Sequence, residues 1–355
     1  MARKYGLVGI DMAYLIALIG TMFVTLFFVI GDRQFNLEYA SFFVWIDFFH
    51  VFFVFLSGYT FAVGLRDRSS SSRRKLSNAA KKGSLFFLIG LLFIGSWAIN
   101  MFLALGVFYL LAGLIGQLGN FILRSAAVLV FLASMICLNL DIPPDHRAEY
   151  FALTLQGAGA KELLAYLLYN GYLSVFPWLS FFLAGMVFGN GNIRPNGWFP
   201  PSSIVGTMLI VLSLFAEMYS KGLYTPSPTW NTIGTYPLNM KFFMPSFVLF
   251  ETGLSIITLN LLNYAYRKNK NKKLQDLLRK IVESRFSILF AMMFGGSLIM
   301  ALFNLIIFKK AFVLFVLSVI IITACLYGII LWKRNFTAKT PVEWIVKRIS
   351  SSTKS

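Results

Sequence analysis

The sequence predicts an all-α, polytopic integral membrane protein with about ten transmembrane helices and both termini in the cytoplasm. Composition, long apolar runs and the placement of basic residues carry this prediction. Of 355 residues, 58% are hydrophobic, 17% aromatic and 13% charged, and the mean hydropathy is +0.73. Soluble domains carry about 25% charged residues. Because a chain this apolar cannot cover itself with polar surface, the composition excludes a soluble domain or a disordered chain.

Ten apolar stretches are candidates for membrane spans. A helix needs about 20 mainly apolar residues to cross the roughly 30 Å hydrocarbon core of a bilayer. The third and fourth stretches are short and meet at Asn100. We expect all of them to form one transmembrane domain, residues 1–332. The predicted spans are 6–30, 39–64, 84–99, 101–118, 121–140, 173–189, 204–219, 242–266, 286–308 and 311–332.

The basic residues predict the orientation. The net charge is +18, and most of the 32 Lys and Arg residues fall on one side of the predicted spans. Because basic loops resist translocation, that side is the cytoplasm, and both termini lie there. The short loops favour a prokaryotic plasma membrane. The charge is dispersed over loop ends without a nucleic-acid-binding signature, so we expect the lipid bilayer, and not a nucleic acid, as the partner.

Two basic segments stand out on the cytoplasmic side. The predicted loop 66–82 reads RDRSSSSRRKLSNAAKK, and its density of charge suits a phosphorylated cytosolic ligand, although basic loops commonly do no more than set orientation. The tail, residues 333–355, contains a predicted amphipathic helix at 341–349 that would rest on the inner leaflet. Its apolar face comprises Val342, Ile345, Val346 and Ile349, with Glu343, Lys347 and Arg348 off that face.

The first predicted span carries a polar stripe. Its residues follow one another at intervals of three or four, which places them on one helical face. Four of the five are polar in an otherwise apolar segment. We therefore expect this face to point at protein or at a wet cavity. The residues are Asp11, Tyr14, Leu18, Thr21 and Thr25.

Four Asp, Glu or His residues fall inside predicted spans and away from the span ends: Asp11, Asp47, His50 and Glu251. A charge near the bilayer centre costs about 2.5–3.5 kcal/mol, so each should face the bundle interior. Asp47 and His50 are i,i+3 neighbours, and an Asp beside a His can raise its basicity, as a general base requires. The alternative is a hydrogen-bond cluster that fixes packing. For Glu251, a proton or cation path and a helix–helix contact both remain open.

Soluble-enzyme motifs do not occur. We find no Walker A loop, no GxGxxG after a strand, no GxSxG elbow and no His/Cys metal spacing. With two histidines in the chain, a multi-histidine metal or haem site is excluded, and we expect no metal and no bound cofactor.

Several stretches together resemble the membrane acyltransferase superfamily that includes the heparan-alpha-glucosaminide N-acetyltransferase and acyltransferase-3 families. GIDMAYLIALIGTMFVT resembles the first-span motif, and DFFHVFFVFLSG resembles an Asp-led, Phe-rich second span ending in Gly. A basic loop and KGSLFFLIGLLF follow, and GYLSVFPWLSFFLAGMVFG resembles a Pro-Trp span of bacterial relatives. The resemblance covers most of the chain.

The resemblance implies transfer of an acyl group, usually acetyl, from cytoplasmic acyl-CoA to a sugar hydroxyl or amine. Asp11 and Asp47 match family positions. The family's first-span Arg falls on Tyr14 and its His on Thr25, and a Gln-Arg pair of the sugar N-acetyltransferases falls on Tyr109 and Leu110. These substitutions remove a cation and a titratable base.

The sequence therefore predicts an acyltransferase-like protein that acts on an envelope glycan or lipid, with acyl-CoA as co-substrate. His50 would be the base, held by Asp47, and Asp11 would belong to the same site. The phosphates of the donor would bind Arg66, Arg68, Arg73, Arg74 and Lys75. Two alternatives remain: a catalytically inactive relative that acts as a membrane binding or assembly partner, and a proton-coupled transporter.

Overall fold

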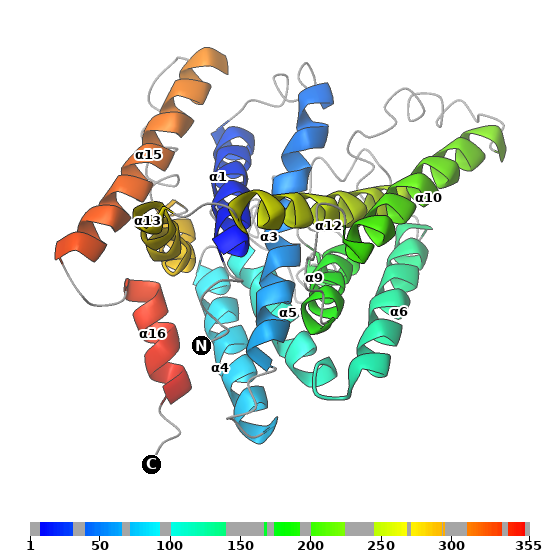
Figure 1. Cartoon of the computed structure of the whole chain (residues 1–355), viewed down its shortest axis with the longest axis horizontal. Coiled ribbons are helices and arrows are strands. Elements are labelled where there is room, and N and C mark those ends of the chain that lie inside the picture. The colour runs from blue at the N-terminus through cyan, green and yellow to red at the C-terminus, as the bar shows by residue number, and fades with distance from the viewer. Residues whose placement is uncertain are drawn as a thin grey trace, which may run out of the picture.

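The computed structural model of the chain describes residues 8–30, 40–65, 72–92, 101–139, 167–168, 174–191, 200–223, 245–267, 271–292, 294, 311–335 and 340–351. Within these ranges the regular structure is helical, and they contain no strand (Figure 1). A further helical stretch at 285–292 follows a turn at 283–284. The helices are α1 (Val8–Ile30), α3 (Ala40–Leu65), α4 (Ser72–Leu92), α5 (Met101–Ile115), α6 (Asn120–Asn139), α9 (Val175–Asn190), α10 (Pro201–Leu223), α12 (Pro245–Arg267), α13 (Lys272–Val282), α15 (Ala311–Asn335) and α16 (Pro341–Ser351).

The all-α prediction is confirmed for the described residues, and several helices have the character of membrane spans. Three contain apolar windows long enough to cross a bilayer: Phe48–Leu65 in α3, Ser246–Tyr266 in α12 and Val316–Asn335 in α15. Shorter apolar stretches occur in α1, α5, α6, α9 and α10. The chain is therefore a helical membrane protein by length and composition of its helices. Ten spans and a cytoplasmic location of the termini stay predictions.

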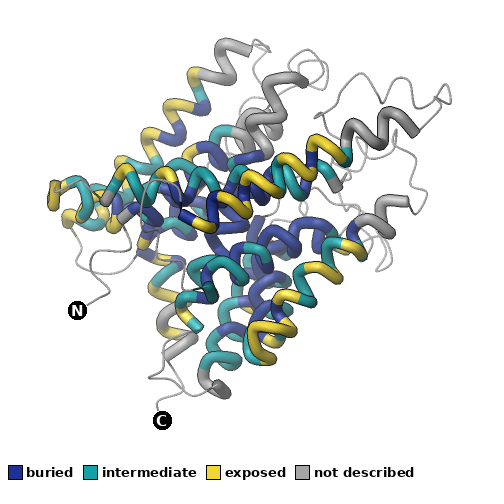
Figure 2. The backbone as a smooth tube through the Cα atoms, turned by 45° about the vertical axis from the view of Figure 1, so that its right-hand side comes forward, coloured by how far each residue is buried: buried dark blue, intermediate teal, exposed yellow. Residues whose placement is uncertain are grey.

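Helix α3 forms the centre of the bundle. Its residues 51–56 are almost completely buried, and it packs against α1, α9 and α12 (Figure 1). Buried residues concentrate in the middle of the molecule (Figure 2). By contrast, large apolar side chains on outer helices are exposed, including Phe121 on α6 and Phe215 on α10, at 81% and 64%. Lipid tails solvate such side chains, so outer helices with this composition fit a bilayer.

Glycines allow the closest helix contacts. On α3 and α9, Cβ atoms added at Gly58 and Gly185 would collide with the carbonyl oxygens of Phe182 and Phe55. A backbone carbonyl cannot swing aside as a side chain can, so only glycine fits at these two positions. Small residues that let backbones approach are the usual device for helix association in lipid.

Two helices extend into segments that the sequence assigned to loops. Helix α4 begins at Ser72, inside the predicted basic loop 66–82, because Arg, Lys, Ala and Ser are compatible with helix where charge alone suggested a loop. Helix α13 lies between two predicted spans. It buries Leu278, Ile281 and Val282 on one face, which is the pattern of an amphipathic helix lying on the bundle.

Candidate functional site

The predicted polar stripe of α1 faces protein. Tyr14, Leu18 and Thr21 are each 1% exposed. The Tyr14 hydroxyl lies 2.7 Å from Oγ1 of Thr60 on α3, and the Thr21 hydroxyl donates to the carbonyl oxygen of Phe49 at 3.1 Å. The prediction for this face is thus confirmed at these positions. The side chain of Thr25 lies outside the described residues.

Arg285 occupies the space beside Tyr14. Its Cζ lies 4.5 Å from the centroid of the Tyr14 ring and 4.8 Å from that of Phe286, so two aromatic rings lie close to the guanidinium. The guanidinium also interacts electrostatically with Tyr109 on α5. The Arg285 Nε is buried without a hydrogen-bond partner among the described residues. Cation–π contacts of this kind strengthen when water is excluded.

Carboxylates from opposite ends of the chain compensate this cation. Both Asp11 and Glu343 interact electrostatically with Arg285. Asp11 also interacts with Arg279 and Glu283 near the end of α13. A partly buried guanidinium is stabilised by such compensation, because an isolated charge away from water is costly. The arrangement joins α1, α5, the 285–292 helix and the C-terminal helix α16.

Glu343 holds α16 against the start of the 285–292 helix. Its Oε1 accepts from the backbone N–H groups of Phe286 at 2.8 Å and Ser287 at 3.1 Å. Its Oε2 accepts from the hydroxyls of Thr340, at 2.6 Å, and Ser287. In return, the Val342 N–H donates to the Ser287 hydroxyl at 3.0 Å. Free N–H groups of a helix start are thus satisfied by a carboxylate from another helix, which also suits the helix dipole.

His50 lies on the stripe of α3 that faces this cluster. Phe53, three residues on, packs edge-on against Tyr14, with 5.9 Å between ring centroids. Thr60, on the same stripe, bonds the Tyr14 hydroxyl. Phe61 packs against Tyr109 at 5.1 Å. Since residues at these intervals share one helix face, His50 is directed to the same side of α3 as the groups around Arg285.

His50 and Ser57, also on this stripe, are both fully buried. The Ser57 hydroxyl oxygen has no hydrogen-bond partner among the described residues. A buried hydroxyl without a partner is rare enough to require a reason, such as a polar ligand or a water. The side chain of Asp47 falls outside the described residues, so the proposed pairing of Asp47 with His50 stays a prediction.

The predicted donor-binding residues are only partly described. Arg66 and Arg68 lie outside the described ranges, and the backbones of Arg73 and Arg74 form the start of α4 while their side chains are not described. Lys75, in the same first turn, is partly exposed. The start of α4 therefore combines basic residues with the free N–H groups of a helix N-terminus, an arrangement that favours phosphate.

Glu251 lies on α12, a helix that contributes none of the residues described around Arg285. It is 1% exposed, and its neighbours Thr252 and Ser255 are 8% and 0% exposed. Further along α12, the amide of Asn260 donates to the hydroxyls of Ser202 and Ser203 on α10, at 2.9 and 3.0 Å. Helix α12 therefore presents a polar edge inside the bundle, as its sequence predicted for Glu251.

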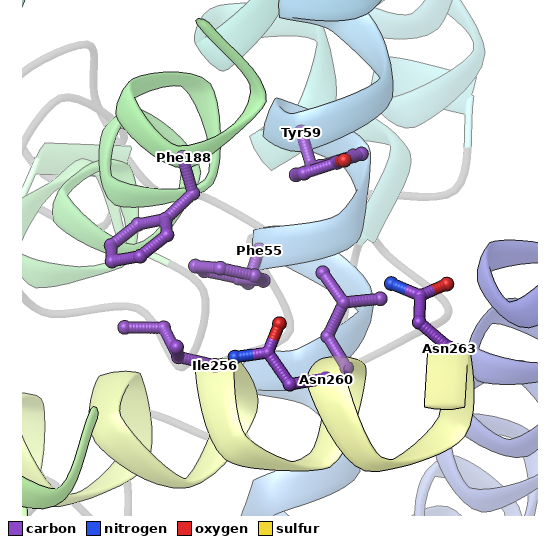
Figure 3. Close-up of a pocket in the computed structure, with 7 residues that line it drawn as sticks. Phe55, Tyr59, Phe188, Ile256, Asn260 and Asn263 are labelled. Carbon is purple, nitrogen blue, oxygen red and sulfur yellow. The ribbon is translucent and has the colours of Figure 1, made fainter. Parts of the chain in front are cut away.

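A small pocket opens between α3, α9 and α12 (Figure 3). The side chains of Asn260 and Asn263 project from α12 toward Phe55 and Tyr59 of α3 (Figure 3). Phe188 of α9 lines the pocket on another side. The space available to centres of water-sized molecules is about 20 Å³. That volume accommodates a water and is too small for an acyl chain or a sugar.

Sequence reasoning missed Arg285 and Glu343. The sequence predicts for Arg285 only that it is one of the basic residues on the cytoplasmic side of the spans, and for Glu343 only that it lies off the apolar face of the tail helix. A sequence signal existed for Glu343: Thr-Pro-Val-Glu at 340–343 has the spacing of a capping box with Pro in the first helical position. In the part of the chain that the structure describes, no group of three His, Cys, Asp or Glu could hold a metal ion.

Comparison of the chain with protein-family models, with curated proteins and with solved structures gives no match.

Proposed function

We propose that the chain is an integral membrane acyltransferase, which moves an acyl (acetyl) group from cytoplasmic acyl-CoA to a hydroxyl or amine of an envelope glycan or lipid. The position of Arg285 carries the proposal. The family that the sequence resembles has an Arg at the position of Tyr14, and in this chain the Arg285 guanidinium lies 4.5 Å from the Tyr14 ring. Arg285, from a later segment of the chain, thus places a cation beside the first-span position at which the resembled family has its Arg.

The stripe of α3 supports a role for His50 in the same site. It carries His50 and Ser57 on the side that packs against Tyr14 and Tyr109. In the proposed reaction, His50 removes the proton from the acceptor hydroxyl or amine, whose oxygen or nitrogen attacks the thioester carbonyl carbon. The carbon–sulfur bond breaks, and the CoA thiolate leaves with the proton that His50 had taken. Arg285 would lower the cost of negative charge near this site.

The start of α4 supports cytoplasmic binding of the donor. Arg73, Arg74 and Lys75 occupy its first turn, and Arg66 and Arg68 precede it in the chain. Phosphates bind to arginine and to helix N-termini through charge-assisted hydrogen bonds. The phosphates of CoA would thus bind at this end of α4, and its acyl end would enter the bundle.

An acyl-transfer assay tests the proposal. Full-length protein in liposomes receives radiolabelled acetyl-CoA, and labelled lipid or glycan is counted for the wild type and for His50→Ala. We expect the variant to lose at least 10²-fold in rate, because it lacks the general base. His146→Ala, which removes the chain's other histidine, is the matched control and should keep the wild-type rate. A wild-type rate in a folded His50→Ala variant would remove His50 from the mechanism.

Glu251 supports a second candidate function, proton-coupled transport. A carboxyl group that is 1% exposed on an apolar helix is a common element of proton paths. Uptake driven by a pH gradient in proteoliposomes, abolished by Glu251→Gln, would establish this function. A pH gradient that drives no uptake of candidate envelope sugars or lipids would contradict it.

A further inference from the structure

One side of the C-terminal helix α16 packs against protein, so only its opposite side is available for other contacts. Glu343 binds the start of the 285–292 helix through three groups, the N–H groups of Phe286 and Ser287 and the Ser287 hydroxyl. Val342 is 5% exposed, and α16 also packs against α4. The sequence placed Val342 on a lipid-facing side. The structure buries Val342 in protein, whereas Ile345 of the same predicted face is exposed, so the surface available to lipid is shifted around the helix.

The outer side of α16 combines apolar and basic side chains. Trp344 and Ile345 are 47% and 38% exposed. The Arg348 Cζ lies 5.0 Å from the centroid of the Trp344 ring. Tryptophan, an aliphatic residue and arginine together are typical of helices at the boundary between headgroups and acyl chains.

The preceding helix, α15, brings the start of α16 within reach of a membrane–water interface. Only 22% of the residues in the apolar window Val316–Asn335 of α15 are buried, which fits a helix that faces lipid along most of its length. The helix ends with Trp332, Lys333 and Arg334, a combination that marks the membrane–water interface. Since α16 begins six residues after Asn335, its start lies within about 21 Å of that interface, even for a fully extended connection.

The charge of this region favours anionic lipid. Lys333, Arg334 and Arg348 are basic, and the carboxylate of α16, Glu343, is turned inward to its four donors. Glu283 pairs with Arg279 at 2.9 Å and lies 3.8 Å from Lys333. The α16 surface at Trp344, Ile345 and Arg348 therefore combines a basic side chain with exposed apolar side chains.

We propose that this surface, formed by Trp344, Ile345 and Arg348, binds the anionic headgroups of the bilayer. Through Glu343, the bound lipid stabilises the start of the helix that carries Arg285. The proposal does not depend on acyl transfer, since it rests on the contacts of α16 alone. Each basic residue near an anionic surface contributes about 1 kcal/mol, which corresponds to a fivefold change in an equilibrium constant.

Hydrogen exchange of the full chain in nanodiscs tests the proposal. The amides of α16 are followed by mass spectrometry in discs of pure phosphatidylcholine and in discs with 30% phosphatidylglycerol. We expect exchange of α16 to slow at least fivefold in the anionic discs, and the difference to shrink at high salt because the interaction is electrostatic. Equal exchange in both lipids would overturn the proposal.

Two variants show where the lipid acts. Arg348→Ala should reduce the difference between the two lipids about fivefold. Arg124→Ala, which removes an exposed arginine on α6, should leave the lipid dependence of α16 unchanged. If Arg124→Ala abolished the difference as fully as Arg348→Ala, the effect would come from the overall charge of the protein, and the assignment to α16 would be wrong.

Discussion

Replacing Glu343 by alanine tests the strongest polar network in the described structure. The substitution removes the acceptor for two backbone N–H groups and two hydroxyls. Loss of a helix cap costs about 1 kcal/mol, and hydrogen bonds to a charged group contribute about 1.5–3 kcal/mol each. Thr340 and Ser287 are 0% and 5% exposed, so water replaces the carboxylate poorly. Because the hydroxyls can turn to nearby carbonyls, we expect a net loss of about 3 kcal/mol.

Hydrogen exchange measures this loss where it occurs. A destabilisation of about 3 kcal/mol corresponds to about 150-fold faster exchange of the amides at the start of the 285–292 helix. Glu343→Gln keeps one acceptor oxygen for the backbone amides and should cost about 1 kcal/mol. The matched control is Glu283→Ala. This carboxylate is 50% exposed and pairs with Arg279, a pair that contributes under about 1 kcal/mol. Exchange within twofold of wild type in Glu343→Ala would refute the reasoning.

Three further substitutions test the packing and the site. Gly185→Ala should abolish the folded yield of detergent-purified protein, because the added Cβ would collide with the Phe55 carbonyl oxygen. Its control, Gly328→Ala, meets nothing within 4 Å on α15 and should be neutral or raise Tm slightly; equal yields would contradict the packing. Asn260→Ala should cost about 1 kcal/mol by chemical denaturation, since it removes two interhelical hydrogen bonds; no change would contradict their role. Arg285→Lys should lower acyl transfer at least tenfold because lysine cannot reproduce the planar contact with Tyr14, and wild-type transfer would exclude that contact from the site.

The sequence predicted features that depend on local spacing. The face of α1 with Tyr14 and Thr21 followed from intervals of three and four residues, and its burial follows the same intervals. The burial of His50 and Glu251 followed from the cost of placing an ionisable group in lipid. The helix at 341–349 followed from its apolar period, and α16 spans Pro341–Ser351.

Features that depend on distant partners could not be predicted in this way. The residues 286 and 343 that meet at the Glu343 network are 57 positions apart. Charge alone does not tell whether Arg285 stays in water or enters the bundle beside Tyr14. The same ambiguity made Ser72–Lys82 resemble a loop, because basic residues set membrane orientation and are also good helix formers. The sequence predicts that Val342 faces lipid, because periodicity identifies an apolar face but does not show whether lipid or protein packs against it.

The binding of acyl-CoA tests the proposed function most directly. Acetyl-CoA is titrated calorimetrically into detergent-purified full-length protein, with desulfo-CoA for comparison. We predict micromolar binding, weakened at least tenfold when Arg73, Arg74 and Lys75 are replaced together by alanine. An absence of binding at millimolar acetyl-CoA, in protein that retains its thermal transition, would contradict acyl transfer and favour a membrane binding partner or a transporter.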